Sequence, residues 1–125
     1  MLFDTDIFIY IQRGNQKAAT LLQDCRQRCI SIITKMELLQ GALNKGHHRV
    51  IQSFLHDFAI KVIPVDENTG YRASIYIEEY ALSYNIRVAD ALIAATAVQA
   101  GLPLVSSNAK HFKAISGLEL QAFRP

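Results

Sequence analysis

Five short apolar runs alternate along this chain with longer segments whose apolar residues recur at helical spacing. The runs are too short for helices and are rich in β-branched or aromatic side chains, which is typical of strands. We expect strands at residues 2–4, 29–33, 61–65, 103–106 and 118–123. Strands that alternate with helices form a mainly parallel sheet covered on both faces. The pattern therefore predicts an α/β fold, a three-layer α/β/α sandwich with a central sheet of about five strands.

The segments between these runs predict six helices. We expect them at residues 7–13, 16–27, 34–43, 48–58, 67–84 and 88–100. Asn15 is a suitable N-cap for the second helix, and the Gly101-Leu102-Pro103 sequence is a typical end for the last one. Pro64 indicates that the third strand lies at a sheet edge or ends there, because proline cannot donate a ladder hydrogen bond.

The composition is that of one ordinary globular domain. The chain has 125 residues, half of them hydrophobic, which is enough for a genuine core. Its net charge of +2 does not by itself indicate a nucleic-acid binder, although a local basic face would not show in a sum. We expect a cytoplasmic protein, because we see no leader segment and polar residues interrupt the most hydrophobic stretch, Val88–Val105.

Three acidic residues stand near the ends of predicted elements. Asp4 ends the first strand, Glu37 follows the second, and Asp90 lies in the first turn of the last helix. Parallel α/β sheets bind their ligands beyond the carboxyl ends of the strands, so all three acids could reach one edge. Carboxylates crowded together need a compensating cation, and hard divalent ions such as Mg²⁺ prefer oxygen ligands. We therefore expect Asp4 to be a metal ligand at this edge.

Each acid also has a purely structural interpretation. Asp4 or Asp6 could cap the next helix, since a carboxylate accepts hydrogen bonds from free backbone N–H groups. Thr34 and Glu37 match the spacing of a capping box. Asp90 near a helix start is favoured by the helix dipole. From the residues alone, both interpretations stay open.

Three blocks of sequence, taken together, resemble the PIN-domain family and most closely its small VapC-type toxins. The blocks read LFDTDIFIYI, SIITKMELLQGA and VADALIAATAVQAGLPLVSSNAKHF. They follow one another over nearly the whole chain, from Met1 to about Leu120, and they are specific as a set. The resemblance implies a single PIN domain over residues 1–125 and an endoribonuclease that depends on Mg²⁺ or Mn²⁺. It also implies inhibition by a cognate VapB-like antitoxin and formation of a homodimer.

The resemblance assigns Asp4, Glu37 and Asp90 to the family's acidic positions, which hold the metal. Its fourth polar position falls at Asn108, where family members often carry Asp. An amide oxygen can still coordinate a metal or orient a water, but it adds no charge, so a second tightly held metal is in doubt. His111 stands where family members often carry an acid, and the sequence assigns it no role.

Two further residues are expected beside the metal. Thr5 is predicted to orient Asp4 through its hydroxyl group, and Asp6 to assist as an extra or outer carboxylate. In the implied reaction the metal activates a water that attacks phosphorus in line, with Glu37 holding the metal or accepting the proton.

RNA binding requires Lys and Arg side chains around the cleft, because the phosphates must be neutralised. The candidates that we prefer are Lys35, Lys110 and Arg13. The segments at residues 16–22 and 71–82 could form the dimer face, or they could belong to the core.

An alternative function is a catalytically weakened PIN-like module that only binds RNA or protein. Asn108 favours this alternative, whereas the three acids argue against it. A nucleotide-binding α/β domain is disfavoured, because QGALNKG does not match the spacing of a phosphate-binding loop.

Overall fold

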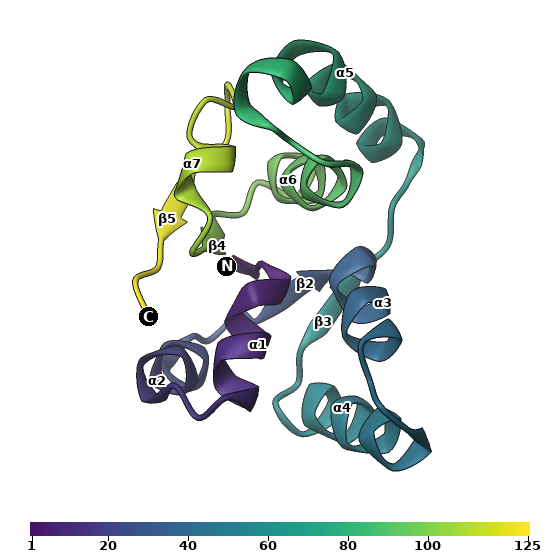
Figure 1. Cartoon of the computed structure of the whole chain (residues 1–125), viewed down its shortest axis with the longest axis vertical. Helices are drawn as coiled ribbons and strands as arrows, with labels where there is room; N and C mark the ends of the chain where they lie inside the picture. Colours follow the sequence, from purple (N-terminus) through teal and green to yellow (C-terminus); the bar gives the residue numbers. More distant parts are fainter.

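A computed structural model describes all 125 residues, and its strands and helices alternate along the chain as the sequence predicts (Figure 1). The elements are β1 (Leu2–Phe3), α1 (Thr5–Gln12), α2 (Gln16–Asp24), β2 (Cys29–Ser31), α3 (Ile32–Gln40), α4 (Lys45–Asp57), β3 (Lys61–Ile63), α5 (Glu67–Tyr84), α6 (Val88–Ala100), β4 (Leu104–Ser106), α7 (Ala109–Phe112) and β5 (Leu120–Ala122).

The five strands form one sheet in the order β3-β2-β1-β4-β5, and every pair is parallel. β3 lies at an edge of the sheet and ends just before Pro64, which confirms the prediction from that proline. The strand order reverses at β1, which has β2 on one side and β4 on the other. The carboxyl ends of β1 and β4 therefore flank a topological switch point, where α/β folds bind ligands.

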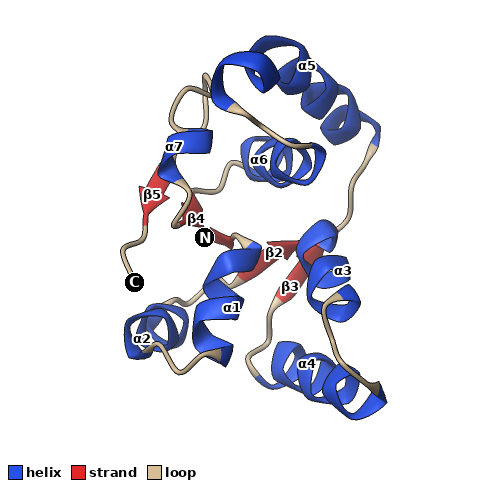
Figure 2. Cartoon of the chain, in the orientation of Figure 1, coloured by secondary structure: helices blue, strands red, loops and turns tan.

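Helices cover both faces of the sheet, so the predicted three-layer sandwich is confirmed (Figure 2). Neighbouring residues of one strand point to opposite faces. Leu2 and Leu104 contribute to a core with residues of α5, α6 and α7. Phe3 and Val105 contribute to a second core with residues of α1, α2, α3 and α4. The central strands are short but buried on both faces, which explains why they read as continuous apolar runs.

Helix caps explain most of the element boundaries. Asn15 accepts a hydrogen bond from the Ala18 N–H, as predicted for the start of α2. Gly101, at φ 66°, ends α6 in the left-handed conformation that glycine adopts without strain. α5 and α6 have the predicted bounds, whereas α7 was not predicted, because four residues are too few to show helical periodicity.

The predicted second strand, residues 29–33, is too long by two residues. Ser31 ends β2 and caps α3, because its hydroxyl accepts a hydrogen bond from the Ile33 N–H. α3 therefore begins at Ile32, two residues before its predicted start. The capping box suggested for Thr34 and Glu37 is wrong, since both residues lie inside α3.

α6 is the most enclosed helix of the molecule. Its buried side chains are mostly small, and they pack between α5 and the sheet: Ala91, Ile93, Ala94, Ala95, Thr96 and Ala97. No helix of this chain combines the length and the apolar character needed to span a bilayer.

Candidate active site

Asp4 follows β1 at the switch point and lies beside the end of β4. Phe3 pairs with Val105, so the next residues, Asp4 and Ser106, are neighbours across the two strands. The Ser106 hydroxyl donates a hydrogen bond of 2.7 Å to Asp4 Oδ2. The Thr5 N–H donates one of 2.8 Å to Asp4 Oδ1, so Asp4 also caps α1. Both oxygens of this carboxylate are therefore held in place by the protein.

The environment of Asp4 disfavours its charge. The residue is only 4% exposed, and burial is the main reason why its pKa rises from 3.8 to about 7. The negative charge of Asp6 raises the pKa further, and that of Asp90 adds a smaller contribution. The hydrogen bonds from Ser106 and Thr5 act in the opposite direction but do not compensate. A buried carboxylate with other acids nearby is a site that a cation would stabilise.

Glu37 is linked to Asp4 through the residue between them in space, Thr5. The Thr5 hydroxyl donates a hydrogen bond of 2.7 Å to Glu37 Oε1, and it lies 3.0 Å from the Thr34 hydroxyl. The prediction that this hydroxyl orients Asp4 is wrong in its partner: the Thr5 backbone N–H binds Asp4, and the side chain binds Glu37. Thr5 thus fixes two acids of the candidate site at once.

Asp6 anchors the loop that follows β4. Its Oδ2 atom accepts hydrogen bonds from both the backbone N–H and the hydroxyl of Ser107. Its other oxygen, Oδ1, is buried and has no hydrogen-bond partner. A buried carboxylate oxygen without a partner is costly, and it is a natural ligand for a bound cation or for a water on such a cation.

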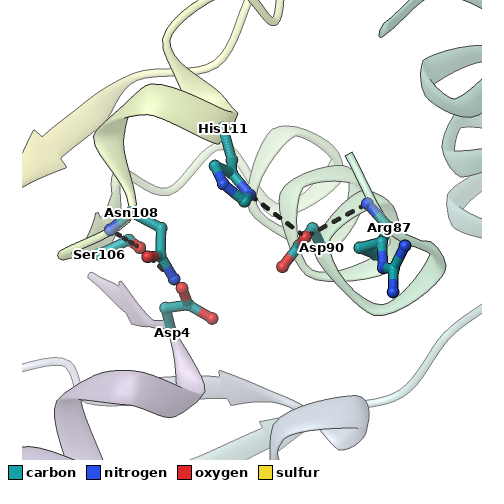
Figure 3. Close-up of polar contacts among 6 residues, drawn as sticks. All are labelled: Asp4, Arg87, Asp90, Ser106, Asn108 and His111. Carbon is teal, nitrogen blue, oxygen red and sulfur yellow. Dashed lines mark hydrogen bonds and ion pairs between the residues drawn. The ribbon is translucent and has the colours of Figure 1, made fainter. Parts of the chain in front are cut away.

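Asp90 combines a capping role with a place in the candidate site. Its Oδ2 atom accepts a hydrogen bond of 3.3 Å from the Arg87 N–H at the start of α6. The same atom lies 3.9 Å from His111 Nδ1, and Figure 3 shows the imidazole turned toward the carboxylate. Only 22% of the Asp90 side chain is exposed. The structural interpretation of Asp90 therefore does not exclude a functional one.

Asn108 lies at the same edge as Asp4, as Figure 3 shows. Its backbone N–H donates a hydrogen bond of 2.9 Å to the Ser106 hydroxyl, which in turn donates to Asp4. Its side chain does not cap α7. Ser106 therefore couples the position of Asn108 to that of the buried carboxylate.

The three predicted RNA-binding cations lie at different places. Lys110 is exposed, two residues after Asn108, and Lys35 is half-buried on α3, two residues before Glu37. Arg13 follows the last turn of α1, about 12 Å along the helix axis from the turn that Asp4 caps. The structure does not bring Arg13 to the acids.

Ser106 and Ser107 are site residues that the sequence interpretation missed. Their contacts to Asp4 and Asp6 join residues about one hundred positions apart in the chain. These two serines could have been found by assuming that β1 pairs with β4, because that pairing places the residues after both strands side by side.

The donor atoms gathered here are oxygens of Asp4, Asp6, Glu37 and Asp90. None of these four acids pairs with a Lys or Arg, and the ion pairs of the chain are His56–Asp57 and His111–Asp90. In these side-chain conformations, no three His, Cys, Asp or Glu side chains converge closely enough to ligate one ion. The acids thus share an edge of the sheet but are not in a closed ligand arrangement.

This arrangement can be compared with known proteins. Ribonuclease VapC1 of Rickettsia felis is 33% identical to this chain, over 96% of this chain and 93% of its own length. A toxin–antitoxin complex from Klebsiella pneumoniae contains a chain of similar structure, with a TM-score of 0.79, 30% identity and coverage of 94% of this chain and 93% of that one. VapBC2 from Rickettsia felis, bound to a DNA fragment from its promoter, gives a TM-score of 0.78 at 25% identity, with 98% of each chain covered.

The family model described as PIN domain matches residues 1–118, which include every acid of the candidate site. The family model and a relative that is 33% identical thus show that the chain belongs to the PIN-domain family, with VapC ribonucleases among its relatives.

Proposed function

We propose that this protein is a divalent-metal-dependent endoribonuclease of the VapC type, the toxin of a toxin–antitoxin pair. One observation carries the proposal: four carboxylates lie around the carboxyl ends of β1 and β4 without a Lys or Arg partner. The names of the relatives, VapC1 of Rickettsia felis and VapC10 of Mycobacterium tuberculosis, support a ribonuclease.

The residues present fit a hard divalent cation. All side-chain donors of the four acids are oxygens, which suit Mg²⁺ or Mn²⁺. The raised pKa of Asp4 and the unpartnered Oδ1 atom of Asp6 both indicate missing positive charge. Asp4, Glu37 and Asp90 would hold the ion, with Asp6 and Asn108 beside them. When bound, such an ion supplies Lewis-acid polarisation of a phosphoryl oxygen and a water of lowered pKa.

The chain's own groups prepare the reaction around this ion. Ser106 and the Thr5 N–H hold the Asp4 carboxylate at the end of β1. Thr5 holds one oxygen of Glu37, and this carboxylate would either hold the ion or accept a proton from the attacking water. Asn108 presents an amide that orients a water or a phosphate oxygen. No side chain is required to form a covalent intermediate.

The partners of the protein follow from the same comparison. The Klebsiella pneumoniae and Rickettsia felis structures are toxin–antitoxin complexes, which supports inhibition of this chain by a cognate VapB-like antitoxin. An Arg from such a partner could pair with these acids, which have no Lys or Arg partner in the chain, because Arg binds carboxylates in a bidentate manner. We also propose a homodimer, which is the expected state for the family.

The test is cleavage of single-stranded RNA by the purified protein. We expect cleavage with Mg²⁺ or Mn²⁺, no cleavage in excess EDTA, and recovery when the metal is restored. Asp4→Ala, prepared in parallel, controls for contaminating nucleases and should be inactive. Undiminished cleavage in excess chelator, or equal cleavage by Asp4→Ala, would contradict the proposal.

A second variant separates the nuclease from a module that only binds. Asn108→Ala should lower cleavage less than Asp4→Ala, because the amide carries no charge and is exposed. A wild-type protein that binds RNA but cleaves none with either metal would favour the weakened binding module instead.

A further inference from the structure

A pocket of about 310 Å³ opens beside the acids, between the loop after β4 and the residues that follow β5. The residues that matter among its lining are Ser107, Asn108, Lys110, His111, Phe123 and Arg124. No Asp or Glu lines it, although four acids lie around the same edge of the sheet. Its size lies at the lower end of the range for small-molecule sites.

This pocket shares a wall with the candidate active site. Asp6 holds Ser107 through two hydrogen bonds, and Ser106 accepts the Asn108 N–H while donating to Asp4. On the same wall, His111 faces Asp90 at 3.9 Å (Figure 3). A ligand in the pocket would therefore contact Ser107, Asn108 or His111, which are the pocket residues linked to the acids of the candidate site.

The position of Arg124 is defined by β5. The Phe123 N–H donates a hydrogen bond of 2.8 Å to the Ser106 carbonyl, which extends the pairing of β5 with the end of β4. The Phe123 ring packs on Tyr10, with 6.0 Å between ring centroids. The backbone is thus fixed up to the residue before Arg124, so the guanidinium starts from a defined point at the pocket.

The two cations of this pocket are free to bind a ligand. Neither Lys110 nor Arg124 makes an ion pair or a side-chain hydrogen bond within the protein, and both are exposed. Free cations beside acids that have no Lys or Arg partner are what a polyanion requires, because its flanking phosphates would otherwise be repelled by the carboxylates.

We propose that this pocket binds a backbone phosphate of single-stranded RNA adjacent to the phosphate positioned at the acids, through Lys110 and Arg124. The inference rests on the proposed function and adds the direction in which the strand leaves the active site. In this proposal the RNA runs from the carboxyl ends of β1 and β4 toward the end of β5.

A second basic pocket provides a matched control. It has a volume of about 390 Å³, and its charged residues are Arg26, Arg28 and Lys61. It lies where β2 and β3 begin, at the amino ends of the strands, whereas the acids lie at the carboxyl ends. Its Arg28 is already engaged, because the guanidinium donates to the carbonyls of Leu22, Gln23 and Phe58. Arg26 and Lys61 are exposed, as Lys110 and Arg124 are.

The experiment measures binding of a fluorescent single-stranded RNA by anisotropy at several salt concentrations. Every protein carries Asp4→Ala and is kept in EDTA, so that no RNA is cleaved. Lys110→Ala with Arg124→Ala should weaken binding about tenfold or more at low salt. It should also reduce the slope of log K against log salt by about 0.7 for each phosphate that the protein no longer neutralises. Lys110→Arg with Arg124→Lys should bind as the parent does.

The control, Arg26→Ala with Lys61→Ala, removes the same charge at the opposite edge and should leave affinity and slope unchanged. Equal losses of RNA affinity in the two double variants would contradict the proposed RNA binding in the pocket, since the change in net charge alone would explain them. The pocket is also overturned if the Lys110/Arg124 variant binds as its parent does while the protein with intact Asp4 cleaves RNA; the proposed function then survives. If the protein neither binds nor cleaves RNA, both proposals fail. Melting temperatures verify that each variant is folded.

Discussion

Asp4 has two tasks at the end of β1. It caps α1 through the Thr5 N–H, and it receives the Ser106 hydroxyl from the neighbouring strand. Two hydrogen bonds would lower the pKa of an exposed carboxylate, but here burial and the charge of Asp6 outweigh them. Asp4 is therefore held in place by its hydrogen-bond partners, but no positive charge compensates its carboxylate. These are the properties expected of a side chain that binds a cation.

The raised pKa of Asp4 predicts how the stability of the metal-free protein depends on pH. Between pH 3.8 and about 7 the folded state binds a proton at Asp4 that the unfolded state releases. Stability should therefore fall as the pH rises from 5 to 8, by an upper limit of about 3 kcal/mol. Melting temperatures in EDTA measure this fall. Asp4→Asn should remove most of it, and a variant with the same pH dependence as the wild type would refute the assignment.

Asp90→Asn should separate the two roles of this acid. Asn still accepts the Arg87 N–H, so the melting temperature should stay the same or rise as repulsion is relieved. RNA cleavage should fall by about a hundredfold or more, because a ligand of the metal loses its charge. The matched control is Asp66→Asn at the start of α5, where the carboxylate also caps a helix by accepting the Thr69 N–H but is not one of the acids of the candidate site. That variant should keep its activity. Loss of stability with full activity in Asp90→Asn would leave only the capping role.

At the scale of elements, α6 joins the core to the site. Its first turn carries Asp90, and its body is packed by small side chains against α5 and the sheet. Alanine at these positions allows close approach of the neighbouring elements and favours the helix. The position of Asp90 relative to Asp4 therefore depends on the packing of a helix that has no room for larger residues.

Ala94→Leu should destabilise the protein by about 1–3 kcal/mol, since the added methylenes enter a fully buried position. The free energy of unfolding is measured by chemical denaturation. Ala100→Leu, on the same helix but exposed, should change stability little. Equal stability of the two variants would mean that the space around α6 is larger than the packing indicates.

At the scale of the whole molecule, α5 leaves apolar side chains on the surface. Within the segments expected to form a dimer face or core, Ala18, Leu22 and Tyr76 are core residues. Tyr71 and Leu82 are largely exposed to solvent instead. Exposed apolar side chains on one helix favour a protein–protein contact, and the proposed homodimer would cover them.

Leu82→Asp should convert the proposed dimer into a monomer without loss of folding, because this side chain is fully exposed in the single chain. Analytical ultracentrifugation measures the mass in solution. Leu43→Asp provides the control, since Leu43 is 88% exposed but lies between α3 and α4. A dimer that persists in Leu82→Asp places the contact elsewhere, and a wild-type monomer contradicts the dimer itself.

Local signals in the sequence are enough to predict every strand and every helix except α7, and the element ends near which the acids stand. α5 and α6 have their predicted bounds because apolar periodicity is a local signal, and because Gly101 ends α6 where the sequence indicates. The acids at positions 4, 37 and 90 stand out for the same reason, since the place of a residue near the end of a strand or the start of a helix is a local property. The end of β2 was misplaced, because Ser31 stops a run whose next residues are equally suited to a strand.

Only the tertiary structure decided which strand ends are neighbours. The pairing of β1 with β4 brings Ser106 to Asp4 and Ser107 to Asp6, and the pairing of β4 with β5 brings Arg124 to the same pocket as Lys110. The tertiary structure likewise brings the Thr5 hydroxyl to Glu37, 32 positions away in the sequence, where it donates a hydrogen bond. Strand order and side-chain geometry arise from packing between segments that are distant in the sequence. The apolar periodicity of a single segment does not show which other segment it packs against.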